Sequence, residues 1–191
     1  MLTHQDLYSL EQYHRLRPEF RAKVMAHKKL RQVELGRHAS LHFEDRLTMQ
    51  YQIQEMIRLE RIYEPELIQE ELDVYNPLIP DGANWKATLM IEYPDPEERR
   101  QALSRLTGFE QAVWMQVGEF SRIAPIANED LERTTPQKTS AVHFLRFELT
   151  PEMVAAAKAG APIRAGVDHP NYAADVTLSP AARESLATDL A

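Results

Sequence analysis

The chain has 191 residues, of which 43% are hydrophobic and 27% are charged, and its formal net charge is −7. Such a chain is long enough for one good-sized core, or for a core with a smaller subdomain, and its composition excludes an intrinsically disordered protein. The absence of cysteine excludes disulfides, thiolate nucleophiles and cysteine-ligated zinc or iron–sulfur centres, so a metal ion would need histidine and carboxylate ligands.

The sequence carries no signal for a membrane or for export. No apolar run approaches the roughly 18 residues that span a bilayer. Residues 1–10 lack the basic and apolar segments of a signal peptide. We therefore expect a cytoplasmic protein.

Basic residues concentrate between Arg15 and Arg37, where eight arginines and lysines accompany two glutamates. The preferred interpretation is a solvated helix face that acids elsewhere in the fold balance. A contact with a phosphate backbone or with an acidic partner protein is the alternative. The negative net charge argues against nucleic acid as the main partner.

The N-terminal part is predicted to be mainly helical. Thr3 and Asp6 form a capping-box pattern that opens a first helix. That helix should end before Pro18, because the residue that precedes a proline avoids the α-helical region. Pro18 then begins a second helix that runs to about Arg31. It is followed by strands at 32–35 and 39–44, a long helix that ends at Tyr63, a helix at 65–74 and a proline-rich loop at 75–82.

From Trp85 onward, strands alternate with helices. Apolar patterns predict strands at 86–93, 112–120, 140–149 and 163–168. The strand at 140–149 is apolar on both faces, so we expect it to be central. Cap-plus-proline pairs and closing glycines predict helices at 95–108, 150–160 and, at the terminus, 179–190.

This order is the β-α-β-β-α-β pattern of ferredoxin-like folds. We therefore predict an α+β fold with two parts. Residues 1–82 form a mainly helical region with a short β-hairpin, and this region packs on residues 83–191, a ferredoxin-like antiparallel sheet with a C-terminal helix. The connection at 121–138 is long for a compact domain, and such segments are usually functional or mobile.

Two glutamates of the long helix occupy unusual positions. At about 100° per residue, Glu55 and Glu60 each fall in the middle of an apolar arc, so both should point towards protein. A buried carboxylate must find a cationic partner, bind a metal ion or take up a proton. The two residues lie about 140° apart around the helix, so they cannot share one ligand. The preferred interpretation is an arginine partner for each, and the alternative is a metal site.

The metal alternative draws on a His/Glu ligand set of Glu55, Glu60, His143 and His169. A lone histidine on a strand face, such as His143, is more often a hydrogen-bonded core residue than a ligand. His42 and Glu44, on the polar face of one strand, form another candidate pair. A ferritin-like di-iron centre is not expected, because the chain has a single Glu-x-x-His motif, from Glu11 to His14.

Asp168 and Tyr172 are candidate binding residues, because they flank the turn after the last predicted strand, where sites often form. The alternative is a turn that Asp168 begins and against which Tyr172 packs. The sequence has no nucleotide-binding glycine loop, serine-hydrolase motif or His-Glu-x-x-His motif, which argues against those enzyme classes.

Five segments together resemble one bacterial protein family, and they lie at residues 13–21, 43–62, 71–80, 87–93 and 167–172. The likeness covers nearly the whole chain. The family is defined only as a domain of unknown function. Its members are often encoded beside a rubrerythrin-like protein and an iron–sulfur oxidoreductase related to the glycerol-3-phosphate dehydrogenase C subunit. The resemblance implies a cytoplasmic protein tied to redox or peroxide handling, and it implies no catalytic residues.

We therefore expect an accessory or binding protein that associates with these redox partners. The 121–138 connection and the basic 15–37 segment are the expected contact surfaces. By fold analogy, a homodimer would form through a sheet edge or face. The alternative is an enzyme or small-molecule sensor with a metal ion held by histidine and glutamate.

Overall fold

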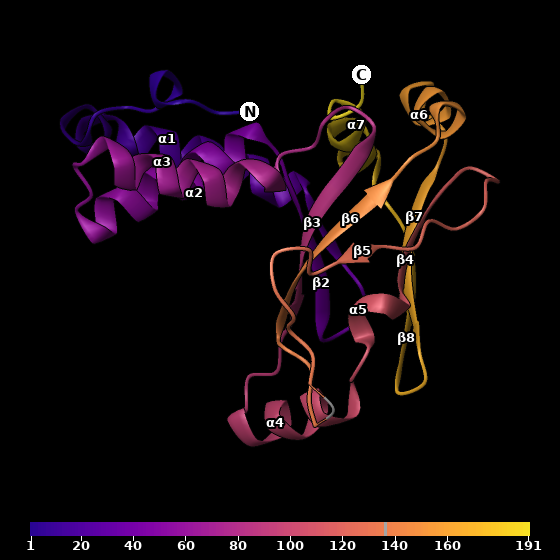
Figure 1. The fold of residues 1–191 in the computed structure, drawn as a ribbon. Helices are drawn as coiled ribbons and strands as arrows, with labels where there is room; N and C mark the ends of the chain where they lie inside the picture. Colours follow the sequence, from indigo (N-terminus) through magenta and orange to yellow (C-terminus); the bar gives the residue numbers. More distant parts are fainter. Residues whose placement is uncertain (136) are drawn as a thin grey trace.

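The computed structural model describes residues 1–135 and 137–191 and has the outline of a letter L (Figure 1). Three helices form an arm that projects from one end of a body built from two β-sheets. We refer to these parts as the helical arm and the sandwich. Helices occur together with antiparallel sheets, which confirms the predicted α+β class.

The helical arm consists of α1 (Leu10–Leu30), α2 (Arg46–Glu60) and α3 (Pro65–Tyr75). The 3-10 turn η1 (His4–Asp6) precedes α1, and η2 (Asn76–Leu78) follows α3. Met49, Ile53 and Ile57 recur at helical spacing on α2, and they pack with Leu72 of α3 and with Leu2 in a small core.

The first helix, α1, is continuous, so the predicted break before Pro18 is wrong. Its N-cap is Ser9, whereas the Thr3–Asp6 pair caps η1. Proline removes one helical hydrogen bond because it has no N–H. The buried residues Tyr13 and Val24 lie on either side of it. Their packing holds both halves of α1 in place and compensates for the missing bond.

The sandwich has two sheets, and every pair of neighbouring strands in the described chain is antiparallel. The larger sheet has the order β1 (Gln32–Glu34), β2 (Ala39–Glu44), β3 (Asn84–Ile91), β6 (Val142–Glu148) and β5 (Ile126–Ala127). The smaller sheet has the order β4 (Val113–Val117), β7 (Ile163–His169) and β8 (Tyr172–Thr177). Their facing side chains, such as Phe43 and Phe147 on one sheet and Met115 and Val167 on the other, share one apolar core.

Four helices complete the sandwich: α4 (Pro96–Arg105), α5 (Phe109–Ala112), α6 (Pro151–Lys158) and α7 (Pro180–Ala187). α6 and α7 lie at the end from which the arm projects, and α4 lies at the opposite end (Figure 1). None of the described helices is both long and apolar enough to cross a membrane.

The ferredoxin-like topology is not confirmed. It would place the four predicted strands in one sheet, but β3 and β6 belong to the larger sheet and β4 and β7 to the smaller one. α4 has no buried residue, so it does not cover a sheet face as a crossover helix does. The prediction also missed β5, which has two residues, and β8, whose two alanines and aspartate give a weak strand pattern.

Two segments connect the parts of the molecule in ways that the sequence did not indicate. The β1–β2 hairpin, predicted as part of the helical region, belongs to the larger sheet. The 121–138 connection crosses from one sheet to the other, because Ile123 pairs with Met115 of β4 while β5 pairs with β6. β6, which was expected to be central, is an interior strand between β3 and the two-residue β5, and the middle strand of the sheet is β3.

Candidate functional site: the corner between the arm and the sandwich

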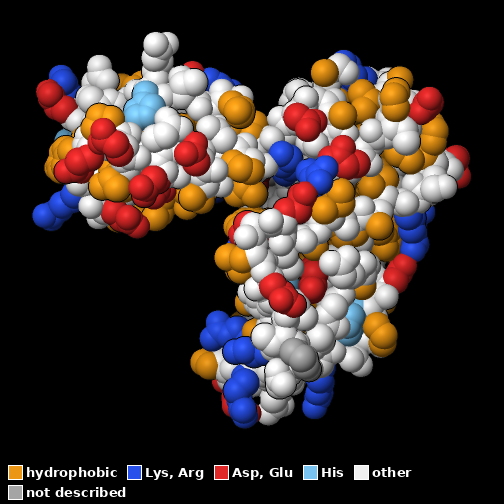
Figure 2. Space-filling model, viewed as in Figure 1, with side chains coloured by type: hydrophobic (Ala, Val, Ile, Leu, Met, Phe, Trp, Pro, Cys, Tyr) orange, Lys and Arg blue, Asp and Glu red, His pale blue; other side chains and the backbone are white. Residues whose placement is uncertain are grey.

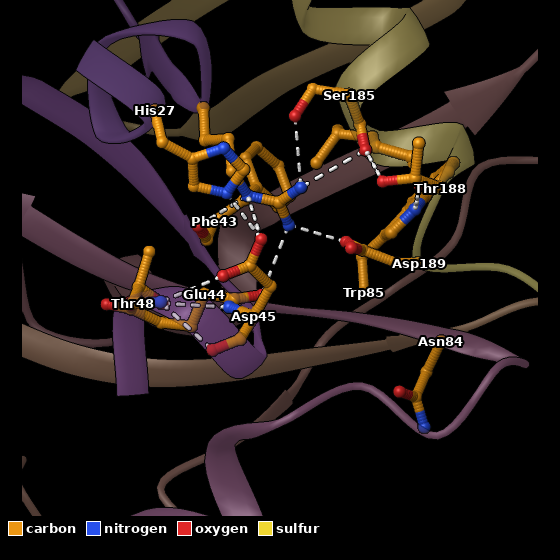
Figure 3. A network of polar contacts seen from close by, with 12 residues as sticks. His27, Phe43, Glu44, Asp45, Thr48, Asn84, Trp85, Ser185, Thr188 and Asp189 are labelled. Atoms are coloured by element: carbon orange, nitrogen blue, oxygen red, sulfur yellow. Dashed lines mark hydrogen bonds and ion pairs between the residues drawn. The ribbon is translucent and has the colours of Figure 1, made fainter. Parts of the chain in front are cut away.

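Arg31, directly after α1, joins the arm to the sandwich. Asp45 of the arm and Ser185 and Asp189 of the sandwich lie around the same network of polar contacts (Figure 3). Arg31 is only 1% exposed. Its guanidinium donates hydrogen bonds to the backbone carbonyls of Phe43, Glu44 and Ser185, and it forms an ion pair with Asp189 at 2.5 Å. Arginine suits this position because its planar fork carries several donors. These contacts hold α1 against β2 and against the C-terminal helix α7.

Two carboxylates, that of the half-buried Asp45 and that of Asp189, lie beside the charge of Arg31. Asp45, the N-cap of α2, lies 3.6 Å from the guanidinium and 2.5 Å from Nε2 of His27. Burial raises the pKa of Asp189 to about 6, although Arg31 opposes this shift. Burial also acts on Asp45, but Arg31, the Thr48 amide and His27 outweigh it and lower the pKa of Asp45. A charged network thus fixes the angle of the arm.

Between the arm and the outer face of the larger sheet lies a groove, which we name the corner groove. It consists of two adjoining hollows that share Tyr75, Leu78 and Phe144 as lining residues. The outer hollow has a volume of about 590 Å³, and the inner hollow one of about 290 Å³. Residues of the arm and of the sheet line both hollows, so the junction at Arg31 also determines the shape of the groove.

The outer hollow combines exposed apolar side chains with an acidic rim. Val74 of α3 is 62% exposed, and Leu131 of the 121–138 connection is 54% exposed. The exposed acids at its edge are Asp73, Glu129 and Asp130. Figure 2 shows acidic side chains over this face of the arm, and acidic and basic side chains together beside the notch between the arm and the sandwich.

The three cations that line the outer hollow are engaged within the protein. Arg146 forms an ion pair with Glu129 at 2.7 Å, and Arg133 forms one with Asp130. Lys86 donates a hydrogen bond of 2.6 Å to a backbone carbonyl. These cations are half-buried while the acids are exposed, so the acid of each ion pair lies on the outer side.

The inner hollow lies over the polar face of β2. Nε2 of His42 lies 2.9 Å from Oγ of Ser40, and the Thr88 hydroxyl donates to the Glu44 carboxylate at 2.8 Å. Burial lowers the pKa of His42, against the opposing effect of Glu44, so the imidazole is neutral at pH 7. The candidate pair His42 and Glu44 thus lines one hollow, with each residue bonded to a neighbouring hydroxyl.

Glu55 lies in the arm and has cationic partners, as predicted. It accepts hydrogen bonds from Arg17 at 2.7 and 3.0 Å, and further ones from Arg58 and the Tyr13 hydroxyl. These bonds, that of Arg17 foremost, lower the pKa of Glu55 to about 2. Glu60, however, is exposed. The prediction that it faces protein is wrong, because α2 ends at this residue.

His143 is a fully buried residue of β6. Its ring lies 3.1 Å from the Asn128 side chain, donates to the Ser140 carbonyl at 3.0 Å and lies 3.9 Å from Glu110. Burial lowers the pKa of His143, against the opposing effect of Glu110. These are the contacts of a hydrogen-bonded core histidine, which was the first interpretation of this residue.

His169, at the end of β7, has both ring nitrogens engaged. Nε2 donates to the Thr107 carbonyl at 3.1 Å, and Nδ1 accepts from the Asn171 amide at 3.1 Å. Glu55, His143 and His169 therefore have no neighbours in common. Within residues 1–135 and 137–191, no group of three or more His, Asp or Glu side chains is arranged to hold a metal ion.

Asp168 and Tyr172 make contacts that join elements of the sandwich. The Tyr172 hydroxyl donates to the Leu35 carbonyl at 2.5 Å and accepts from the His38 amide at 3.0 Å, which links β8 to the β1–β2 hairpin. Asp168 forms an ion pair with Arg122. Neither Asp168 nor Tyr172 lines the corner groove.

The corner groove was not predicted, although two of its features are visible in the sequence. Leu131 stands in an acidic run, Glu129 to Glu132, and strand β6 has a second apolar face with Val142 and Phe144. Neither feature by itself predicts a groove. Only the position of the arm brings these residues together around one groove.

Comparisons with known proteins place the chain in a family. The model for "Protein of unknown function (DUF3501)" matches residues 1–190. A protein from Burkholderia pseudomallei K96243, solved at 1.90 Å and titled a novel protein of unknown function, shares 50% sequence identity and a TM-score of 0.94, with 100% of this chain and 99% of that chain covered. The comparison with curated proteins gave no match. The chain belongs to the DUF3501 family, which confirms its predicted membership of a family of unknown function.

Proposed function

We propose that this chain is an accessory protein that binds a partner protein in the outer hollow of the corner groove. The observation that carries the proposal is that Val74 and Leu131, two exposed apolar side chains from distant parts of the chain, line the same hollow. Exposed apolar groups with a polar rim are typical of protein interaction sites. Here one group belongs to the arm and the other to the sandwich.

The acidic rim favours a basic segment as the occupant of the outer hollow. Asp73, Glu129 and Asp130 line the hollow together with Val74 and Leu131, and Glu129 and Asp130 also pair with Arg146 and Arg133. A partner segment that carries an apolar side chain between lysines or arginines would bury that side chain between Val74 and Leu131. Its cations would face the acids, and such complementarity speeds association and selects the partner.

The family resemblance suggests which proteins the partners are. We propose the rubrerythrin-like protein and the iron–sulfur oxidoreductase encoded beside members of this family, with the encounter in the cytoplasm. The chain has no cysteine, so cysteine-ligated clusters would reside in the partners. The role of this chain would be to associate with the redox proteins.

Isothermal titration calorimetry of the full chain with each purified partner, at low salt, tests the proposal. We expect a complex with at least one of them. Val74→Ala combined with Leu131→Ala should weaken it at least about tenfold, because truncated apolar anchors cost more than about 1 kcal/mol. Leu59→Ala is the matched control, since Leu59 is also 62% exposed and does not line the groove. If neither partner binds, the redox association is wrong.

A further inference from the structure

The inner hollow contains a buried carboxylate that has no cationic partner. Glu44 is only 7% exposed, and it lines the hollow. One of its carboxylate oxygens accepts a hydrogen bond from the neutral hydroxyl of Thr88. In the described part of the chain, no lysine, arginine or histidine forms an ion pair with it. Glutamate is almost never buried to this extent unless it is paired.

The groups around Glu44 do not supply the missing charge. Lys86 lies opposite Glu44 on β3, but its ammonium group donates to the Pro77 carbonyl. His42 is held by Ser40 at 2.9 Å and is neutral at pH 7. Arg31 donates to the backbone carbonyl of Glu44 and not to its carboxylate. Lys28 also lines the inner hollow, but its ammonium group lies over the Tyr51 ring, 5.9 Å from the centroid. The inner hollow therefore contains one basic and one acidic side chain, Lys28 and Glu44, that form no ion pair with each other.

The remaining lining of the inner hollow is mainly apolar and aromatic, and it consists of Met49, Tyr75, Leu78, Met90, Val142 and Phe144, with the amide of Gln52. The volume of about 290 Å³ lies just below the usual range for ligand sites, so only a small ligand fits. Aromatic faces also attract cations. Such a hollow suits a small molecule that carries an ammonium group and an apolar body.

We propose that the inner hollow binds a free α-amino acid with an apolar side chain. The ammonium group would bind Glu44, whose other contact, with Thr88, already orients the carboxylate. The carboxylate of the ligand would bind Lys28, and its side chain would contact the apolar lining. This site goes beyond the binding of a partner protein, although the two hollows share Tyr75, Leu78 and Phe144.

Isothermal titration calorimetry of the full chain with leucine and with methionine tests this inference. We expect saturable binding of at least one of them. N-acetyl-leucine lacks the ammonium group, and isoamylamine lacks the carboxylate. Both should bind at least about tenfold more weakly than leucine, which corresponds to the loss of one charge-assisted contact. Equal binding of N-acetyl-leucine, or no binding of either amino acid at millimolar concentration, would overturn the proposal.

Variants of the chain assign the binding to the inner hollow. Glu44→Gln keeps the shape and the acceptor for Thr88, and it should weaken leucine binding at least about tenfold. Glu34→Gln, at an exposed position of the neighbouring strand β1, is the matched control. Circular dichroism verifies that each variant is folded. Unchanged binding by folded Glu44→Gln would contradict the proposed site. The Val74→Ala, Leu131→Ala variant should retain leucine binding, which separates this inference from partner binding.

Discussion

The helical arm and the sandwich reach stability by different means. The sandwich has one large apolar core, in which Trp85, Phe109 and Phe147 are fully buried. The arm has a much smaller core around Ile53 and Leu72. The difference follows from architecture, because two facing sheets enclose a core whereas one layer of three helices leaves most of its surface in water.

Polar side chains complete the packing of the arm. Gln54, buried in α2, accepts from the Tyr8 amide at 2.6 Å and donates to the Tyr8 carbonyl at 3.3 Å. Asn76 makes the same pair of bonds with Leu2, at 2.7 and 2.9 Å. Such bonds are directional, and a buried polar group that loses its partner costs about 1–3 kcal/mol. The packing within the arm therefore depends on individual polar contacts, whereas that of the sandwich strands depends on a filled apolar core.

The largest effect is expected at the junction of the two regions. Arg31→Met removes the cation from a site that holds Asp45 and Asp189, so the carboxylate of Asp189 would lose its ion-pair partner and that of Asp45 would keep only His27. Breaking a buried ion pair in this way costs about 3–5 kcal/mol. The free energy of unfolding from urea titrations at pH 7 measures the loss.

Arg15→Met is the control for this substitution. Arg15 pairs with Glu11 on the surface of α1, and its side chain is 69% exposed. Exposed pairs contribute at most about 1 kcal/mol, so this variant should remain close to the wild type. If Arg31→Met were as stable as Arg15→Met, the junction would depend on apolar packing, and the comparison of the two regions would fail.

A second experiment asks whether the arm opens independently of the sandwich. Ile53→Ala leaves a cavity in the small core and should cost about 2–5 kcal/mol, and Phe147→Ala in the sandwich should cost about 3–5 kcal/mol. Hydrogen exchange of the backbone amides distinguishes the two variants, because a region with few apolar contacts opens locally. Ile53→Ala should speed exchange in α1, α2 and α3 and leave β3 and β6 protected. Phe147→Ala should speed exchange in both regions, and equal patterns for the two variants would contradict separate opening.

A smaller effect, with a pH dependence, is expected from Glu55. Its pKa of about 2 in the folded protein lies below the ordinary value of 4.5, so the folded state binds fewer protons than the unfolded chain between these values. The stabilisation is fully present above pH 4.5 and is lost as the pH falls towards 2. Glu55→Gln should cost about 1–3 kcal/mol at pH 7. Urea titrations should show this difference shrinking as the pH falls towards 2.

Glu60→Gln is the matched control on the same helix. Glu60 is exposed, and surface substitutions of this kind usually change stability by less than about 0.5 kcal/mol. Its difference from the wild type should stay small at every pH. A cost for Glu60→Gln equal to that for Glu55→Gln would mean that the ion pairs of Glu55 do not stabilise the arm.

Local signals predicted most of the individual elements. α4, α6 and α7 each begin with a proline directly after a capping residue, namely Asp95, Thr150 and Ser179. These signals are reliable because the hydrogen bonds of an N-cap join neighbours in the chain. The same reasoning failed at Pro18, where buried residues on both sides of the proline outweigh its local preference.

The pairing of the strands could not be predicted in the same way. An alternating strand such as β3 needs an apolar neighbour, but its pattern does not say whether that neighbour is β4 or β6. Pairing with β4 and pairing with β6 would each bury the same side chains of β3. The structure divides the four predicted strands between two sheets, and the contacts responsible join residues far apart in the chain.

The sequence by itself determined the α+β class, most helix starts, the inward position of Glu55 and the core character of His143. Each of these follows from helical or strand period and from local hydrogen bonding. Only the tertiary structure decided the two-sheet topology and the corner groove. The groove depends on the angle of the arm, and that angle depends on contacts such as Arg31 with Asp189, which are 158 positions apart. A pattern read along the chain does not contain the angle between two elements, because packing and charge pairing set that angle only when distant segments meet.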